Sequence, residues 1–479
     1  MSMMLPGVKP ALIRGLIEER VDPMLFRLSY DYVGDLAETV SLLWEGKPEA
    51  DPPGLAEVVE RLRSLSRSEA PAALSALLDR LDATGRYALL KLATGNLRVG
   101  AGARLARVAF AQAFGVSPDD VEELWHGVEP PYAELFAWGE GRGPRPDLAA
   151  LPLFRPFMLA HPLEDPEALD VAAYAAEWKW DGIRAMAVRV NGQVRLYSRD
   201  GNDISATFPE IATALQTDAV IDGELLVRGE GAVGSFNALQ QRLGRKTVSA
   251  AMQAQYPVLL RCYDLLFDGA EDVRELPLGQ RRARLTQVVE RLDPTRFDLS
   301  PDLHAETLED LARLRAEPPD PAIEGLMLKR RDSSYSAGRR AGLWYKWKRP
   351  PLTADCVLMY AQRGHGKRSS FYSDYTFGCW TEEGELLPVG KAYFGFTDEE
   401  LRRLDKYIRD NTIERFGPVR SVRAEPDHGL VIEVAFEGLQ KSSRHRSGVA
   451  MRFPRVSRLR WDKPAFEADR LDTLQAMLQ

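Results

Sequence analysis

The spacing of hydrophobic positions changes twice along the chain and divides it into three parts. Over residues 1–145, apolar side chains recur with helical spacing, as in Leu55–Leu65, Ala72–Leu81 and Ala103–Phe114. The three prolines of Glu45–Gly54 predict a loop between helices. We therefore expect an all-α domain in the first part of the chain.

The middle part begins after Gly139–Pro156, whose Gly, Pro and Arg residues predict a linker. Short strand-like runs follow, with helical segments between them. The expected strands are Glu177–Trp180, Ala185–Arg189, Val194–Tyr197, Ala219–Val227, Val258–Phe267 and Gly325–Lys329, and the expected helices are Leu278–Leu292 and Leu308–Arg315. We expect an α+β domain with antiparallel sheets over residues 152–350.

The last part, residues 351–479, is dominated by short strand-like runs separated by turns. The expected strands are Asp355–Gln362, Tyr375–Thr381, Glu385–Tyr393 and Val431–Phe436. One helix is expected to start at Thr397, because Glu400 completes the spacing of a capping box. The pattern predicts a small five-stranded OB-fold β-barrel with an inserted helix.

Composition agrees with a multidomain globular protein. The chain has 479 residues, 45% hydrophobic and 28% charged, and no run is apolar and long enough to span a bilayer. No signal peptide pattern is found near Met1, so we expect a cytoplasmic protein with no membrane partner. Three scattered cysteines argue against a disulfide framework or a zinc site, so any metal should be a hard cation held by carboxylates.

Charge is unevenly distributed. The net charge is −7, but Arg86–Arg107 holds five cations and no acid, and Lys441–Lys463 holds eight cations against Asp462 alone. Binding to a polyanion depends on such patches more than on the sum. Around the Gly95–Gly100 turn, charge alone favours a solvated helix face over a phosphate-contacting loop. The basic turn Gly364–Lys367 fits DNA contact and a plain hairpin turn equally well.

The most distinctive stretch is Glu177–Arg184, which reads EWKWDGIR. Lys179 stands between two tryptophans at the end of an expected strand, Tyr174–Trp180, and Gly182 permits a sharp turn. This arrangement places one amine at the lip of a pocket, beside a carboxylate and a guanidinium. The stretch fits a nucleophilic lysine, and it also fits an ordinary exposed strand lysine.

Further candidates for chemistry follow in a fixed order, each at a strand end or turn. They are Ser198–Gly201 with Arg199, Val220–Leu225 with Asp222 and Glu224, Tyr263–Gly269, Ile323–Lys329 with Glu324, and Trp344–Arg349 with Lys346 and Lys348. Each alone also fits a solvated strand end. Together, their order and spacing decide the interpretation.

This ordered set resembles the nucleotidyltransferase motifs of ATP-dependent DNA ligases, and the resemblance covers nearly the whole chain. The last family motif appears in Arg452–Lys463, and the Gly95–Gly100 turn resembles the DNA-binding helical domain of longer members. The resemblance implies three parts: a helical DNA-binding domain (1–145), an adenylation (nucleotidyltransferase) domain (152–350) and an OB-fold domain (351–479). It also changes the interpretation of the Gly95–Gly100 turn from solvated face to DNA contact.

The resemblance implies a role for each matching residue. Lys179 would attack the α-phosphate of ATP and form lysyl–AMP. Glu177, Arg184, Arg199, Glu224, Tyr263, Lys346, Lys348, Arg460 and Lys463 would bind the nucleotide; Glu224 and Glu324 would hold Mg²⁺, with Mn²⁺ as an alternative; and Arg98, Arg104, Lys367, Arg444 and Arg446 would contact DNA. Tyr263 departs from the phenylalanine common in the family, but stacking on adenine survives this change.

The implied chemistry makes demands that the residues can meet. A free lysine has a pKa of ~10.4, so holding Lys179 neutral near pH 7 costs about 4–5 kcal/mol; nearby cations and desolvation supply such shifts. Arg460 and Lys463 would orient the leaving pyrophosphate during adenylation. In nick sealing, the OB-fold domain would swing round so that another face meets the duplex, which requires a hinge, expected at Lys348–Leu352. AMP would then pass to a 5′-phosphate at a nick, and the 3′-hydroxyl would displace it.

Other functions remain open from the residues alone. An RNA ligase or a capping guanylyltransferase would share the lysyl–nucleotide chemistry, although the helical domain argues against capping. An NAD-dependent ligase is disfavoured because no four-cysteine zinc module is present. A DNA-binding scaffold would be expected to lose Lys179 or Glu324. We expect a monomer acting on nicked duplex DNA; nothing but the resemblance separates ATP from GTP.

Overall fold

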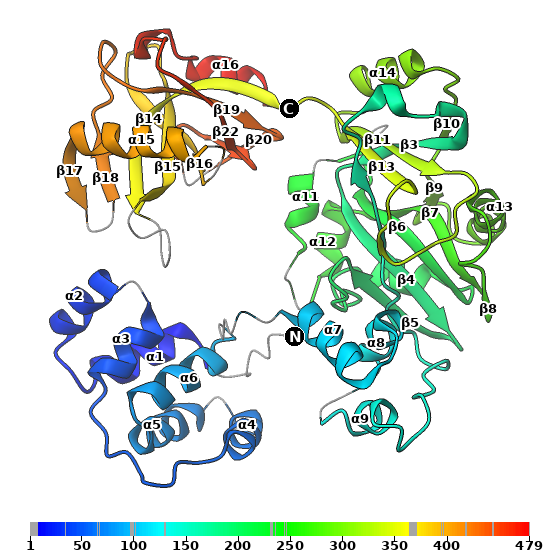
Figure 1. The fold of residues 1–479 in the computed structure, drawn as a ribbon, viewed down its shortest axis with the longest axis horizontal. Coiled ribbons are helices and arrows are strands. Elements are labelled where there is room, and N and C mark those ends of the chain that lie inside the picture. The colour runs from blue at the N-terminus through cyan, green and yellow to red at the C-terminus, as the bar shows by residue number, and fades with distance from the viewer. Residues whose placement is uncertain are drawn as a thin grey trace. The chain divides into compact units, whose positions relative to one another are not determined.

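The protein is described by a computed structural model. It describes residues 8–478 except 34, 65, 67, 96–99, 101, 129–130, 230–232, 235, 244, 246, 364–370, 394, 396, 417–418 and 443–444. The chain forms two compact units, one of residues 104–350 and one of residues 1–103 together with 351–479. Figure 1 shows the elements of each unit.

The first helices of the chain pack around one apolar core. They are α1 (Pro10–Glu18), α2 (Pro23–Val33), α3 (Leu36–Leu43), α4 (Leu55–Ser64), α5 (Ala70–Arg80) and α6 (Ala83–Ala93). Asp35 caps α3 by accepting from the Glu38 amide, and Asp82 caps α6 in the same way through Gly85. Ile17, Val40 and Leu74 lie fully buried in the core of this helical cluster. The helices expected around residues 55–65 and 72–81, and the loop 45–54, are confirmed.

Three further helices belong to the unit of residues 104–350. They are α7 (Ala103–Phe114), α8 (Pro118–Trp125) and α9 (Ala133–Gly139), and they bury Phe110, Val121 and Leu135 among them. Glu123 of α8 forms an ion pair with Arg274 at the start of the loop before α13. The helical part of the sequence is therefore divided between the two units.

The unit of residues 104–350 is built on two mainly antiparallel sheets. One has the order β10-β3-β11-β13-β2, with β2 His161–Pro162, β3 Tyr174–Trp180, β10 Asp302–Leu303, β11 Ile323–Arg330 and β13 Trp344–Lys348. The other has the order β5-β4-β6-β7-β8 with β9 on β7, and comprises β4 Ile183–Val190, β5 Gln193–Ser198, β6 Ala219–Val227, β7 Val258–Asp268, β8 Glu271–Asp272 and β9 Phe297–Leu299. The expected α+β fold with antiparallel sheets is confirmed.

Helices flank these sheets, and one short strand pair stands apart from them. The helices are α10 (Pro209–Ala214), α11 (Phe236–Gln240), α12 (Ala250–Gln255), α13 (Leu278–Val289) and α14 (Leu308–Ala316); the pair joins β1 (Met158–Leu159) to β12 (Gly338–Arg339). In Figure 1, α13 lies beside β7, and Leu285 and Val288 of α13 belong to the same core as the β7 side chains.

The chain crosses from one sheet to the other directly after Lys179. β3 ends at Trp180 in the first sheet and β4 begins at Ile183 in the second. Gly182 makes this crossing possible, because a Cβ there would lie 2.5 Å from the Leu225 carbonyl oxygen of β6. Gly325 serves β11 in the same way: its φ is 146°, and a Cβ would lie 2.3 Å from the Trp347 carbonyl oxygen. Both glycines bring strands close beside the lysine.

Residues 351–479 form a seven-stranded sheet that includes β16-β15-β14-β18-β17, with β19 joining β14 to β22. Its strands are β14 (Leu352–Arg363), β15 (Tyr372–Trp380), β16 (Leu386–Ala392), β17 (Thr412–Phe416), β18 (Val419–Val422), β19 (Val431–Phe436) and β22 (Arg455–Arg460), beside a pair of β20 (Gly438–Lys441) and β21 (Val449–Arg452) and a helix α16 (Leu471–Ala476). The inserted helix α15 (Asp398–Asp410) carries the expected capping box of Thr397 and Glu400. The strands outnumber the five expected.

Candidate active site

A cavity of about 480 Å³ lies in the unit of residues 104–350, lined by strands of both sheets. All the nucleotide and metal candidates of this unit line it: Glu177 and Lys179 from β3, Arg184 from β4, Arg199 after β5, Glu224 from β6, Tyr263 from β7, Glu324 from β11, and Lys346 and Lys348 from β13. Residues up to 171 positions apart in sequence, from Glu177 to Lys348, thus meet at one site.

Lys179 forms an ion pair with Glu324 inside the cavity. The strand register explains the meeting, because Gly325 of β11 pairs with Lys179 of β3 on one side and with Lys348 of β13 on the other. Lys348 Nζ consequently lies 3.7 Å from Glu324 Oε2. The Lys179 side chain is 22% exposed, so its amine reaches the cavity while its stem is packed.

Glu224 and Arg184 line the cavity, whereas Asp222, on the same strand as Glu224, is not among the lining residues. Burial has the largest effect on the pKa of Glu224 and raises it to about 8; the charges of Lys179 and Arg184 act to lower it, and those of Asp222 and Glu324 to raise it. Asp222 is fully buried and holds Arg184, whose Nε and Nη2 donate to Oδ1 and Oδ2 at 3.1 and 2.7 Å.

Several cations also line the cavity. Burial lowers the pKa of Lys346, and the neighbouring charges of Lys348, Arg339, Lys179 and Arg199 lower it further. So many positive charges around one cavity repel one another and favour an anion of high charge. A polyphosphate fits this requirement.

Glu177 and Tyr263, the two residues expected to bind adenine, both contact the buried side chain of Lys329. Lys329 Nζ donates to Glu177 Oε1 at 2.9 Å and lies 4.3 Å from the centre of the Tyr263 ring. Burial lowers the pKa of Lys329, although the Glu177 charge opposes the change. The sequence reasoning missed Lys329. Its signal was the alternation of β11, which places Met327 and Lys329 on one face, and both line the cavity.

A divalent cation fits the chemistry of the site. Within the described ranges no group of three or more His, Cys, Asp or Glu side chains is arranged to hold a metal ion. Glu224 and Glu324 offer two carboxylates, and a positive ion between them would relieve the repulsion that helps raise the pKa of Glu224. Mg²⁺ characteristically takes one or two carboxylates and completes its shell with water and phosphate oxygens.

The remaining candidates that the structure describes are not among the residues that line this cavity. Arg460 and Lys463 both donate to Asp355 Oδ2, at 3.2 and 2.8 Å, within residues 351–479. Arg446 is exposed and pairs with Glu385 at 2.8 Å, and Arg104 is exposed on α7. Arg98, Lys367 and Arg444 lie outside the described residues.

Three cations of the basic stretch 86–107 have structural partners. Arg86 is buried and donates to the Leu78 and Trp44 carbonyl oxygens. Lys91 pairs with Asp35, and Arg107 pairs with Glu122 at 2.6 Å. These three side chains stabilise helix packing, which leaves Arg104 as the exposed cation of this stretch among the residues that the structure describes.

Comparison with known proteins decides the family. The model described as ATP dependent DNA ligase domain matches residues 157–348, and the model described as ATP dependent DNA ligase C terminal region matches residues 368–463. The chain belongs to the ATP-dependent DNA ligases. It is therefore an enzyme that uses ATP, binds nicked DNA and seals the nick.

Relatives extend the match to the rest of the chain. A probable DNA ligase of Koribacter versatilis is 37% identical over 477 residues, covering 93% of this chain and 81% of its own. A DNA ligase of Methanococcoides burtonii is 30% identical over 443 residues, covering 88% and 76%. The solved structure Pmar-Lig_PreS3 shares the ligase fold with a TM-score of 0.57 and 15% identity, covering 95% of this chain and 99% of that one.

The C-terminal unit of this ligase is OB-like, and its central domain is the nucleotidyltransferase adenylation domain of the family. Among the residues described, no helix of the ligase is long and apolar enough to cross a membrane.

Proposed function

We propose that Lys179 is the residue of this ligase that carries AMP. The observation that supports this role is the cavity itself, where Lys179 contacts Glu324 and where Lys346 and Lys348 of β13 also line the wall. Nζ forms a bond to the α-phosphorus, the bond from that phosphorus to the bridging oxygen breaks, and pyrophosphate leaves. Glu324 is within reach to accept the proton that Nζ must lose.

The other lining residues position ATP for this attack. Tyr263 stacks on adenine, and Glu177, oriented by Lys329, accepts from the adenine amino group. Arg184 and Arg199 hold the ribose and phosphates, and Lys346 and Lys348 bind the α-phosphate. Phosphoryl transfer of this kind depends on positioning and charge neutralisation more than on acid–base groups.

Glu224 and Glu324 would hold Mg²⁺, or Mn²⁺ in its place, which neutralises charge on the phosphates when bound. The same two carboxylates orient the amine of Lys179 and balance the charge of the surrounding cations. Arg460 and Lys463 orient the pyrophosphate as it leaves.

We further propose three domains, with boundaries at 1–145, 152–350 and 351–479, and a hinge at Lys348–Leu352. The described residues from Pro10 to Gly139 form helices and no strand, which supports a helical DNA-binding domain. Arg98, Arg104, Lys367, Arg444 and Arg446 contact the DNA backbone. The enzyme acts as a cytoplasmic monomer.

The test is incubation with ATP labelled on the α-phosphate and Mg²⁺, followed by denaturing electrophoresis, on protein first stripped of AMP with pyrophosphate. The wild type should become labelled, and the label should leave when nicked duplex DNA is added. Lys179→Ala should remain unlabelled. Label on the Lys179→Ala protein would overturn the assignment of the nucleophile.

A further inference from the structure

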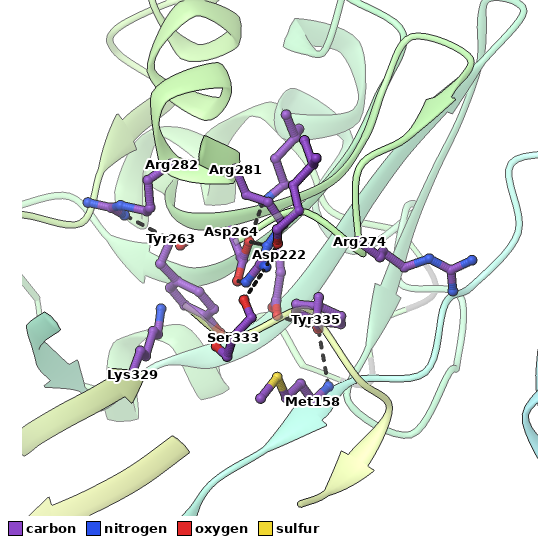
Figure 2. Close-up of polar contacts among 12 residues, drawn as sticks. Met158, Asp222, Tyr263, Asp264, Arg274, Arg281, Arg282, Lys329, Ser333 and Tyr335 are labelled. Atoms are coloured by element: carbon purple, nitrogen blue, oxygen red, sulfur yellow. Dashed lines mark hydrogen bonds and ion pairs between the residues drawn. The ribbon is translucent and has the colours of Figure 1, made fainter. Parts of the chain in front are cut away.

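A buried network behind the cavity holds Arg184 in place. Tyr335 lies in the segment between β11 and β13, and its hydroxyl donates to Asp222 Oδ2 at 2.7 Å. The same Asp222 carboxylate takes both donors of the Arg184 guanidinium edge. Figure 2 shows Tyr335 between Asp222 and Met158. Tyr335 is 4% exposed and Asp222 is fully buried, so this hydrogen bond is shielded from bulk solvent.

The Tyr335 hydroxyl also fixes the other side of Arg184. Its oxygen accepts from the Met158 amide at 3.2 Å. The preceding residue, Phe157, lies with its ring 4.4 Å from the Arg184 guanidinium carbon. One hydroxyl thus connects the carboxylate that holds the edge of the guanidinium with the backbone that presents a ring to its face.

The Tyr335 hydroxyl stays protonated. Burial, and next the Asp222 charge, hold the pKa of Tyr335 well above its ordinary value. The hydroxyl therefore donates to Asp222 at every working pH, and its one remaining role is to accept from Met158.

The segment that carries Tyr335 is anchored independently of this hydroxyl. Arg281 donates to the Ser333 carbonyl oxygen at 2.8 Å and holds Asp264 through two bonds at 2.8 and 3.0 Å. The Tyr335 amide donates to the Arg274 carbonyl oxygen at 2.7 Å, and the Tyr335 ring packs edge-on to Trp344 with centroids 5.9 Å apart. Removing the hydroxyl alone should leave the ring and the segment where they are.

We propose that Tyr335 is a positioning residue for nucleotide binding, which acts through Asp222 and Met158 to hold Arg184 in the orientation that ATP requires. The inference rests on the proposed role of Arg184 at the ribose and phosphates. It predicts that the hydroxyl contributes to ATP affinity only while Arg184 is present.

The test compares Tyr335→Phe, Arg184→Ala and the double variant. Calorimetric titration with a non-hydrolysable ATP analogue should show affinity roughly tenfold weaker for Tyr335→Phe, the size expected for one hydrogen bond to a charged group. In the Arg184→Ala protein, the same substitution should change the affinity by less than about twofold, because the group it positions is gone. In single-turnover labelling, Tyr335→Phe should raise the ATP concentration for half-maximal lysyl–AMP formation more than it lowers the maximal rate.

Tyr197→Phe is the matched control. Tyr197 is a buried tyrosine of the same apolar cluster, and its hydroxyl donates to the Pro152 carbonyl oxygen at 2.7 Å, away from Arg184. This variant should bind the analogue as the wild type does. Wild-type affinity in Tyr335→Phe would overturn the inference, and so would an equal loss in the presence and absence of Arg184, which would show a general structural role. If the wild type were not labelled by ATP, the proposed function would be overturned instead. That outcome is distinguishable, because it is measured on the wild type and Lys179→Ala, whereas the role of Tyr335 is measured on Tyr335→Phe and Arg184→Ala.

Discussion

At the scale of single residues, the contact between Lys179 and Glu324 brings the amine to the cavity and an acceptor to the amine. Glu324→Gln keeps the shape of the side chain but removes its charge and most of its basicity. We expect lysyl–AMP formation to slow about 100-fold or more, as for loss of a positioned proton acceptor. Single-turnover labelling with saturating ATP measures the rate.

The control for this substitution is Glu271→Gln. Glu271 is also ion-paired, with Arg284 at 2.7 Å, but its side chain is 60% exposed and lies outside the cavity. Its labelling rate should equal that of the wild type. A wild-type rate in Glu324→Gln would remove Glu324 from the reaction.

The buried side chain of His126 should make the free energy of unfolding depend on pH in the acid range. It follows α8, its ring lies 4.7 Å from that of Phe154, and burial, and then the Arg107 charge, lower its pKa from 6.5 to about 4. Between these values the unfolded chain takes up a proton that the folded protein refuses, so the free energy of unfolding falls as pH drops from 6.5 towards 4. His126→Gln should show a shallower fall of Tm between pH 7.5 and 5. His304→Gln, at a histidine whose side chain is 89% exposed, should keep the wild-type slope; an unchanged slope in His126→Gln would contradict the prediction.

At the scale of elements, strand pairing decides which charges meet. β14 and β22 both pair with β19, and Asp355 of β14 thereby lies within reach of Arg460 and Lys463. Without this carboxylate the two cations would repel each other. Asp355→Asn should therefore slow lysyl–AMP formation, where Arg460 and Lys463 are proposed to hold pyrophosphate, and should spare sealing of a nick that already carries AMP.

The two steps are measured separately, by labelling with ATP and by ligation of a synthetic adenylylated nick without ATP. Asp374→Asn is the control, because Asp374 holds Lys391 at 2.9 Å in the same unit and has no proposed role in catalysis. Equal losses in both steps for Asp355→Asn would show that Asp355 supports folding alone.

Some elements of the structure could be predicted from the sequence and others could not. Local sequence patterns predict the strand Tyr174–Trp180, which contains Lys179, and the capping box at Thr397. The structure has both. Over β22 the sequence indicates a basic stretch and predicts no strand. A bulge in its pairing spaces its buried Val456 and Leu459 by three residues, which removes the alternation that marks a strand. The role of Tyr335 could not be predicted from the sequence, because its partner Asp222 is 113 residues away and only the fold brings the two side chains together.

At the scale of the whole molecule, a chain of net charge −7 must bind a polyanion through local cations. Arg104 and Arg446 are exposed and belong to different parts of the chain. If each contacts one phosphate, Arg104→Ala and Arg446→Ala should each weaken binding of nicked duplex without regard to its sequence. Each should also reduce the slope of log affinity against log salt by about 0.9.

Equilibrium binding of a fluorescent nicked duplex over a range of NaCl concentrations measures both quantities. Arg313→Ala is the matched control, because Arg313 is 71% exposed on α14 and pairs with Asp310 without a proposed DNA contact. Labelling of Lys179 by ATP needs no DNA, so it should proceed at the wild-type rate in all three variants. An unchanged salt slope in both Arg104→Ala and Arg446→Ala would show that other cations hold the duplex, whereas a loss of labelling would show that the substitutions had damaged the fold. Reduced salt slopes together with wild-type labelling of Lys179 would show that these arginines contribute to DNA binding and not to lysyl–AMP formation.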